Sequence, residues 1–172
     1  MSQPNILNAA TNVQKMLRNI SYILDASAQD AIREEINRQV FELFKLGENH
    51  YLFAVKIKSL RGFDEEIVWR QRISRLYYGI YNVRRAIMLA CEGIYSTSSD
   101  DHQKVENLPD GMNNVAMYKR RIRDLRADRN LADYDHLASI DKLTQTPDDA
   151  EILVFEFIKD ARDFLNERGI PV

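Results

Sequence analysis

Apolar residues recur along most of the chain at steps of three and four, the spacing that places side chains on one face of an α-helix. The pattern predicts helices over residues 5–26, 27–60, 64–93, 112–129 and 147–168. Gly47 is a candidate break inside the second of these stretches, because glycine is a weak helix former. The sequence therefore predicts a chain made of helices and their connections.

Several of the predicted helix ends carry capping signals. Ser27 is a suitable N-cap for the second helix, and Asp64 is one for the third, where two glutamates follow it and suit the positive helix end. Gly93 closes the third helix, and Pro147 opens the last one. The polar stretch at residues 95–110 is expected to be a long loop, and loops of that length are often functional.

The composition agrees with a helical fold. The chain has 172 residues, of which 45% are hydrophobic and 29% charged, as in an ordinary globular domain. It has only 6 glycines and 4 prolines, too few to punctuate many short strands. We therefore expect one all-α domain over residues 1–172, an antiparallel helical bundle with an additional N-terminal helix at about residues 5–26.

The net charge and the cysteine content indicate which partners and which compartment to expect. A formal net charge of -2 excludes a polycation that coats nucleic acid, so any RNA contact must come from a local patch. No apolar stretch approaches the roughly 20 residues that span a bilayer, and the first residues do not resemble a signal peptide. The single Cys91 cannot form an intramolecular disulfide. We expect a cytoplasmic protein without membrane contact.

The most basic part of the chain is residues 119–129, in the fourth predicted helix. Asp124 is spaced to pair with Arg120 or Arg121, whereas most of the run has no acidic partner at helical spacing within the predicted helix. Two interpretations follow: a solvated helix face, or a surface that contacts RNA phosphates. The cations of this candidate RNA-binding surface are Lys119, Arg120, Arg121, Arg123 and Arg126.

Common enzyme motifs are absent from the sequence. It has no phosphate-cradling glycine loop, no paired cysteines and no HExxH segment. The imidazoles are His50, His102 and His136, and none lies at a close ligand spacing from another. We therefore expect neither a metal site nor a cofactor.

One short segment combines residues suited to RNA cleavage. Arg129 and Asn130 are followed, after a short gap, by His136, where the basic helix gives way to a loop. This arrangement resembles the motif of the HEPN superfamily, small helical domains many of which are ribonucleases marked by an Arg, a polar residue and a His.

Further segments in the same order strengthen this resemblance. The stretch 73–86 is similar to the family's "SRxYYxxF…aRAL" helix, residues 132–135 are similar to its "ADYD" segment, and His102 to Val105 is similar to its "HxxV". The resemblance spans about residues 51–165 and leaves the N-terminal helix outside. It implies a HEPN-like helical bundle.

The resemblance implies a metal-independent endoribonuclease of toxin or defence type. An imidazole can move a proton near neutral pH, and a guanidinium can stabilise the extra charge on phosphorus. As implied by the family, His136 would act as general base or acid, Arg129 would clamp the phosphate and Asn130 would orient groups. Two copies of the motif would meet across a homodimer.

The resemblance also leaves a second function open. A non-catalytic HEPN module could use the same fold to bind a nucleotidyltransferase of the MNT type, as an antitoxin, or another helical protein. The additional N-terminal helix could serve such a contact. In relatives inactivated by a nucleotidyltransferase, the motif His is followed after one residue by a Tyr, whereas here His136 is followed by Leu137 and Ala138. The chain therefore lacks a Tyr at the position that such a partner modifies.

Overall fold

The computed structural model describes residues 26–95 and 99–172, which form four α-helices and two short 3₁₀ helices. The helix predicted at residues 5–26 lies almost wholly outside the described part. The α-helices, in chain order, are α3 (Ala26–Ile57), α4 (Glu65–Glu92), α5 (Val115–Tyr134) and α6 (Pro147–Asn166), and the 3₁₀ helices are η1 (Ser99–Lys104) and η2 (Ile140–Lys142).

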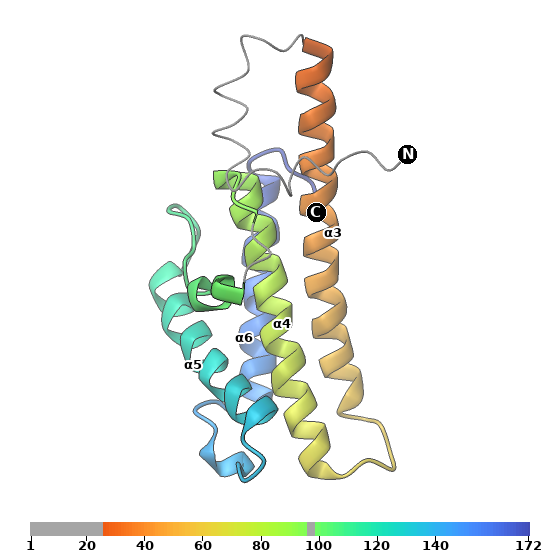
Figure 1. The fold of residues 1–172 in the computed structure, drawn as a ribbon, viewed down its shortest axis with the longest axis vertical. Coiled ribbons are helices and arrows are strands. Elements are labelled where there is room, and N and C mark those ends of the chain that lie inside the picture. Colours follow the sequence, from red (N-terminus) through yellow and green to blue (C-terminus); the bar gives the residue numbers. More distant parts are fainter. Residues whose placement is uncertain (1–25, 96–98) are drawn as a thin grey trace.

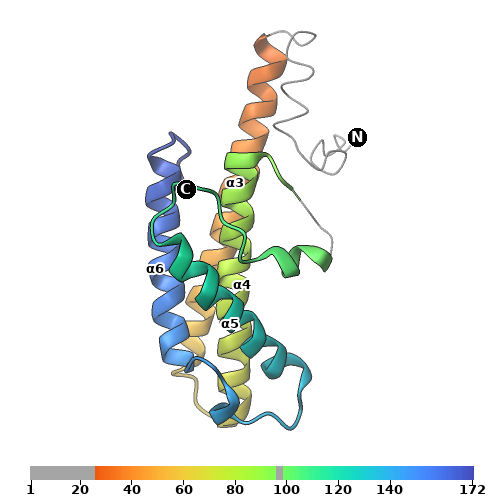
Figure 2. The same ribbon diagram turned by 90° about the vertical axis from the view of Figure 1, so that its left-hand side faces the viewer.

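Helix α4 is the centre of the bundle and packs against the other three α-helices. Successive helices run in opposite directions, with α3 and α5 on opposite flanks of α4 and α6 behind it (Figure 1). Figure 2 shows that η1 lies on the side of α4 away from α6. The described residues contain no strand, so the predicted all-α class is confirmed for them.

The long helix α3 continues through Gly47, so the predicted break at this residue is wrong. Gly47 faces α4 so closely that a Cβ atom would lie 2.6 Å from Val83 Cγ2 and 2.7 Å from the carbonyl oxygen of Gly79. The glycine therefore allows α3 and α4 to pack closely. Glycine has a low helix propensity, but α3 has 32 residues and remains helical through this position.

The predicted signals at both ends of α4 are confirmed. Asp64 Oδ1 accepts a 2.7 Å hydrogen bond from the backbone N–H of Glu66. Gly93 takes the left-handed conformation with φ 62°, and its N–H donates to the carbonyl of Leu89. These caps satisfy backbone groups that the helix itself leaves unpaired.

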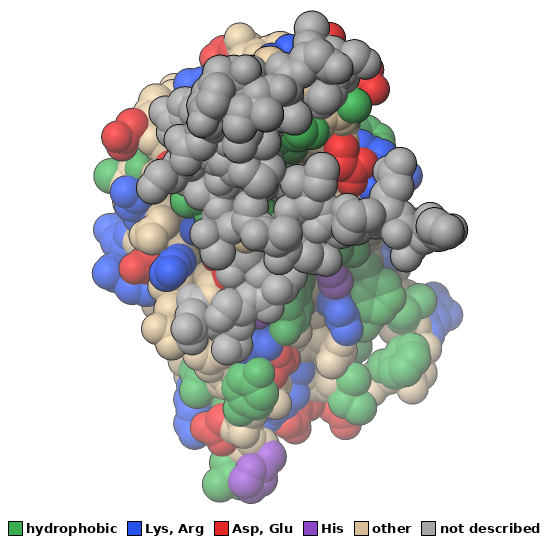
Figure 3. Space-filling view, turned by 45° about the horizontal axis from the view of Figure 1, so that its top comes forward, with side chains coloured by type: hydrophobic (Ala, Val, Ile, Leu, Met, Phe, Trp, Pro, Cys, Tyr) green, Lys and Arg blue, Asp and Glu red, His purple; other side chains and the backbone are tan. Residues whose placement is uncertain are grey.

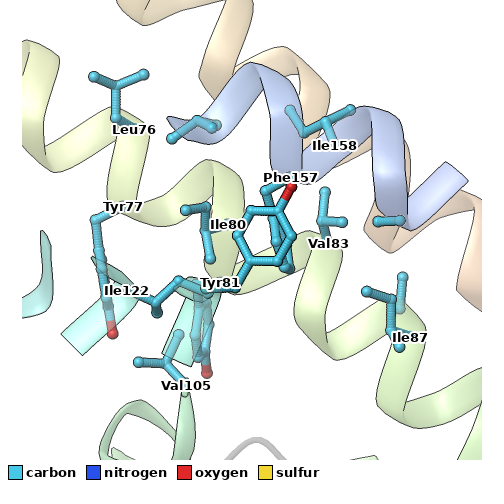
Figure 4. Packing of buried hydrophobic residues seen from close by; sticks show 14 of the residues in the cluster. Leu76, Tyr77, Ile80, Tyr81, Val83, Ile87, Val105, Ile122, Phe157 and Ile158 are labelled. Carbon is cyan, nitrogen blue, oxygen red and sulfur yellow. The ribbon is translucent and has the colours of Figure 1, made fainter. Parts of the chain in front are cut away.

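The hydrophobic core lies between α4 and its neighbours. In Figure 4, Leu76, Ile80, Val83 and Ile87 follow one another along α4 at the predicted steps of three and four, near side chains from α5 and α6. Buried residues from all four α-helices belong to the same cluster. Tyr77 and Tyr81 are buried with them.

Two boundaries differ from the prediction near the candidate site. The polar stretch at 95–110 contains the 3₁₀ helix η1, and α5 continues five residues beyond Arg129, to Tyr134. The second difference arises because Asp133 lies one turn after Arg129 and forms an ion pair with it, which supports a further helical turn.

Helix α6 begins as the sequence predicted. Pro147 is its first residue, and the Thr146 side chain caps it by accepting a hydrogen bond from the N–H of Asp149. Of the helices in the described ranges, none has both the length and the apolar character needed to cross a membrane.

Candidate functional site

Arg129 is held in the last turns of α5 against α4. Its Nη2 donates a 2.6 Å hydrogen bond to Tyr78 Oη, and its Nε lies 2.8 Å from Asp133 Oδ2 without the alignment of a hydrogen bond. The side chain is only 11% exposed. Burial opposes its charge, but Tyr78 and Asp133 outweigh that effect and raise the pKa of Arg129. The guanidinium is therefore charged and fixed in place.

Aromatic rings surround the same guanidinium. Its Cζ lies 5.5 Å from the ring centroid of Tyr77, 5.3 Å from that of Tyr78 and 5.0 Å from that of Tyr134. Cation–π contacts of this kind favour a charged group at a partly desolvated position. Tyr77 and Tyr78 both come from α4, so this helix positions the candidate arginine.

The structure brings Asn130, but not His136, into contact with Arg129 within one chain. The Asn130 side-chain oxygen accepts a 3.2 Å hydrogen bond from Arg129 Nη1. His136 is exposed just beyond the end of α5, after the C-cap residue Asp135. Within the described ranges, no hydrogen bond, ion pair or ring contact involves its side chain, so the imidazole is accessible from outside.

A different imidazole, that of His102, lies beside the arginine. His102 Nδ1 is 2.8 Å from Tyr77 Oη, and its ring stacks on that of Tyr81 with centroids 4.2 Å apart. Burial lowers the pKa of His102, and the positive charge of Arg129 lowers it further. The similarity of this segment to the family's "HxxV" is the sequence signal that marks His102, which lies outside the motif of Arg129, Asn130 and His136.

Helix α3 adds a third imidazole on the other flank of α4. The His50 ring centroid lies 5.7 Å from that of Tyr78, and the neighbouring Arg75 guanidinium lies over the ring of Phe53, 5.8 Å from its centroid. Burial, followed by the charge of Arg75, lowers the pKa of His50. No motif marks these residues, because their proximity depends on how α3 packs against α4.

The predicted RNA-binding cations divide into two groups. Arg121 is engaged by Gln145 Oε1 and by the carbonyl of Asp149, and Arg126 Nη1 donates to the carbonyls of His102 and Gln103. These two arginines tie α5 to its surroundings. The second group is Lys119, Arg120 and Arg123. Their side chains are exposed and make no hydrogen bond or ion pair with the described residues.

Figure 3 shows Lys and Arg side chains gathered along the left-hand edge of the molecule, the side on which α5 lies in Figure 1. This surface can attract phosphate despite the net negative charge of the chain.

Asp128 has a structural role beside the site. It is fully buried and accepts hydrogen bonds from the backbone N–H groups of Thr144, at 2.7 Å, and Gln145, at 3.0 Å. Burial raises the pKa of Asp128, and these hydrogen bonds oppose the change. The carboxylate thus fixes the connection between α5 and α6, in which His136 lies.

Residues 26–95 and 99–172 contain no group of three or more His, Cys, Asp or Glu side chains placed to hold a metal ion. No family model matches the chain, and neither the curated proteins nor the solved structures include a significant match. The resemblance to the HEPN superfamily therefore rests on the motifs of the chain itself.

Proposed function

We propose that the protein is a metal-independent endoribonuclease of toxin or defence type and a member of the HEPN superfamily. The observation that supports this proposal is the geometry at the end of α5: a fixed, charged Arg129 beside Asn130, with an accessible His136 after the last turn. Guanidinium and imidazole are the groups that RNA cleavage without metal requires.

In the proposed reaction, the 2′-oxygen of a ribose attacks the adjacent phosphorus and loses its proton to an imidazole. The bond from phosphorus to the 5′-oxygen breaks, that oxygen takes up a proton, and the products are a 2′,3′-cyclic phosphate and a 5′-hydroxyl. Two proton transfers suit a homodimer in which each subunit contributes His136 to one site.

Arg129 would stabilise the charge that develops on the phosphate oxygens. Its Nη2 and Nε face Tyr78 and Asp133, whereas Nη1 has one hydrogen bond to the described residues, which it donates to the exposed Asn130. The Nη1 edge is therefore the part of the guanidinium that an RNA phosphate would reach. Asn130 would hold that edge in position.

The test is RNA cleavage by the purified protein in the presence of EDTA. We expect the unmodified protein to produce fragments with 2′,3′-cyclic phosphate ends and His136→Ala to lose at least about a hundredfold in rate. Ser139→Ala, an exposed neighbour on the same connection, is the matched control and should keep full activity. Equal cleavage by the unmodified protein and His136→Ala, or cleavage by neither, would contradict the proposal.

A second candidate function is a non-catalytic module that binds a nucleotidyltransferase or another helical protein. Exposed apolar side chains on two helices favour it, among them Phe41 and Leu52 of α3 and Phe155 of α6. Large exposed apolar patches are common at protein interfaces. This function predicts no RNA cleavage in the assay above and a stable complex with the partner.

A further inference from the structure

Arg75 of α4 is a half-buried cation. Among residues 26–95 and 99–172 it makes no hydrogen bond or ion pair, and its Nε is buried without a partner. Two other half-buried arginines, Arg70 and Arg129, form ion pairs with carboxylates. Removing a charge from water without compensation is unfavourable, so the environment of Arg75 suits an anionic ligand.

The contacts of Arg75 connect it to the candidate site. Its guanidinium lies over the ring of Phe53, and its charge acts on His50, whose ring lies 5.7 Å from that of Tyr78. Tyr78 in turn accepts the hydrogen bond from Arg129. A continuous set of cationic and aromatic side chains therefore crosses α4 from α3 to α5.

We name this set the cation–aromatic strip. Helix axes that pack together lie about 8–10 Å apart, so a strip across three helices is roughly 16–20 Å long, comparable to a few nucleotides. Both ends of the strip carry an exposed ring beneath a guanidinium, since Phe53 is 47% exposed and Tyr134 is 71% exposed. Its members are His50, Phe53, Arg75, Tyr78, Arg129 and Tyr134.

We propose that the cation–aromatic strip binds a single-stranded segment of RNA. Arg75 and Arg129 would contact phosphates, and the exposed rings of Phe53 and Tyr134 would stack on unpaired bases. Proteins that bind single strands combine these elements, because every base has a face that can stack, whereas the bases of a duplex are already paired and stacked. The ligand class rests on the proposed function, but binding is separable from cleavage.

The experiment measures the affinity of the full chain for a fluorescent oligouridine of about 12 nucleotides. Each 2′-hydroxyl of this probe is methylated, so the attack needed for cleavage is impossible. Fluorescence anisotropy at several salt concentrations gives Kd and its salt dependence. We expect Arg75→Gln to weaken binding about tenfold and to reduce the slope of log Kd against log salt by about 0.7, the value for one phosphate contact on a single strand.

Matched variants separate charge, stacking and general electrostatics. Arg75→Lys should keep the salt slope, and Phe53→Ser should weaken binding about fivefold while keeping that slope. Arg61→Gln removes an equally charged, exposed side chain from the α3–α4 connection and should change neither quantity. Because Phe53 is exposed, its replacement tests the strip even if Arg75→Gln fails to fold.

Several outcomes would overturn the inference: no binding of the probe by the unmodified protein, equal binding of a duplex of the same length, or unchanged affinity in both Arg75→Gln and Phe53→Ser. A change in oligomeric state on Arg75→Gln, with RNA affinity unchanged, would assign the strip to a protein contact. If the strip binds the methylated probe but the protein does not cleave RNA, the proposed function fails and this inference stands.

Discussion

The guanidinium of Arg129 is held in place on two sides, while its Nη1 side faces the exposed Asn130. Tyr78 and Asp133 hold Nη2 and Nε, so the guanidinium cannot swing away from α4. A group that is already oriented loses less conformational entropy when it binds a phosphate. We therefore expect replacement of Arg129 with Lys to reduce phosphate binding strongly. An ammonium group lacks the planar donor fork that contacts Tyr78, Asp133 and a phosphate at the same time.

His102 predicts a pH dependence of stability. Burial and the charge of Arg129 lower the pKa of this imidazole in the folded chain. The unfolded chain takes up the proton first, at about pH 6.5, so the free energy of unfolding falls as the pH drops through that value. Because His102 is partly exposed, solvent screening keeps the effect small.

The measurement is the unfolding temperature at about pH 7.5 and about pH 5.5, on either side of the ordinary value for an imidazole. We expect His102→Gln to show a smaller decrease between the two pH values than the unmodified protein. Gln103→Ala, the exposed neighbouring residue, serves as the control. An identical decrease in His102→Gln would show that protonation of this imidazole is not linked to unfolding.

The sequence allowed part of the candidate site to be predicted. Arg129, Asn130 and His136 lie in one short segment, so their spacing could be read directly. The segment could not reveal that Arg129 reaches Tyr78, because the two residues are separated by 51 positions and meet only where α5 packs on α4. His50 and Arg75 were not predicted as site residues, because their place beside Tyr78 and Phe53 depends on how α3 packs on α4.

The packing of α3 on α4 depends on a close approach at Gly47. In Gly47→Ala, the new methyl group would meet a backbone carbonyl, that of Gly79, at 2.7 Å, so one helix must move. Overpacking of this kind costs about 1–3 kcal/mol. The better helix propensity of alanine returns only about 1 kcal/mol. We therefore expect a net loss of up to about 2 kcal/mol in the free energy of unfolding.

Chemical denaturation would measure this difference. Asn49→Ala, an exposed position on the same helix, should be neutral or slightly stabilising, because only the propensity changes there. If Gly47→Ala had the same free energy of unfolding as Asn49→Ala, α3 and α4 could move apart at Gly47 without loss of stability. That result would contradict a role for Gly47 in packing.

The helices themselves were predictable because their signals are local. The periodic apolar face and the caps of α4 depend on residues close together in the chain, and the structure has both. Two features could not be predicted in this way, the packing role of Gly47 and the last turn of α5. Both depend on contacts that the spacing of apolar residues in the sequence does not predict. Gly47 lies against another helix, and the extension to Tyr134 accompanies an ion pair between Arg129 and Asp133.

The proposed function requires two copies of the chain, since the described residues leave His136 without contact to Arg129. Two exposed apolar side chains follow His136 on the same connection: Leu137 is 74% exposed and Ile140 is 51% exposed. Burial of such side chains stabilises an association by about 25 cal/mol for each Å² removed from water. We therefore expect the subunits to pair at the end of α5.

Leu137→Asp tests this arrangement at its centre. A carboxylate at the middle of an apolar contact would have to be desolvated without a partner, so we expect a folded monomer with at least about a tenfold lower rate of RNA cleavage. Light scattering after size exclusion gives the mass, and circular dichroism shows that the helices are intact. Leu46→Asp introduces the same charge at an exposed apolar position of α3 and should leave both mass and activity unchanged. A Leu137→Asp variant that stays dimeric and cleaves RNA at the normal rate would place the subunit contact elsewhere, and His136 would then have to act within its own chain.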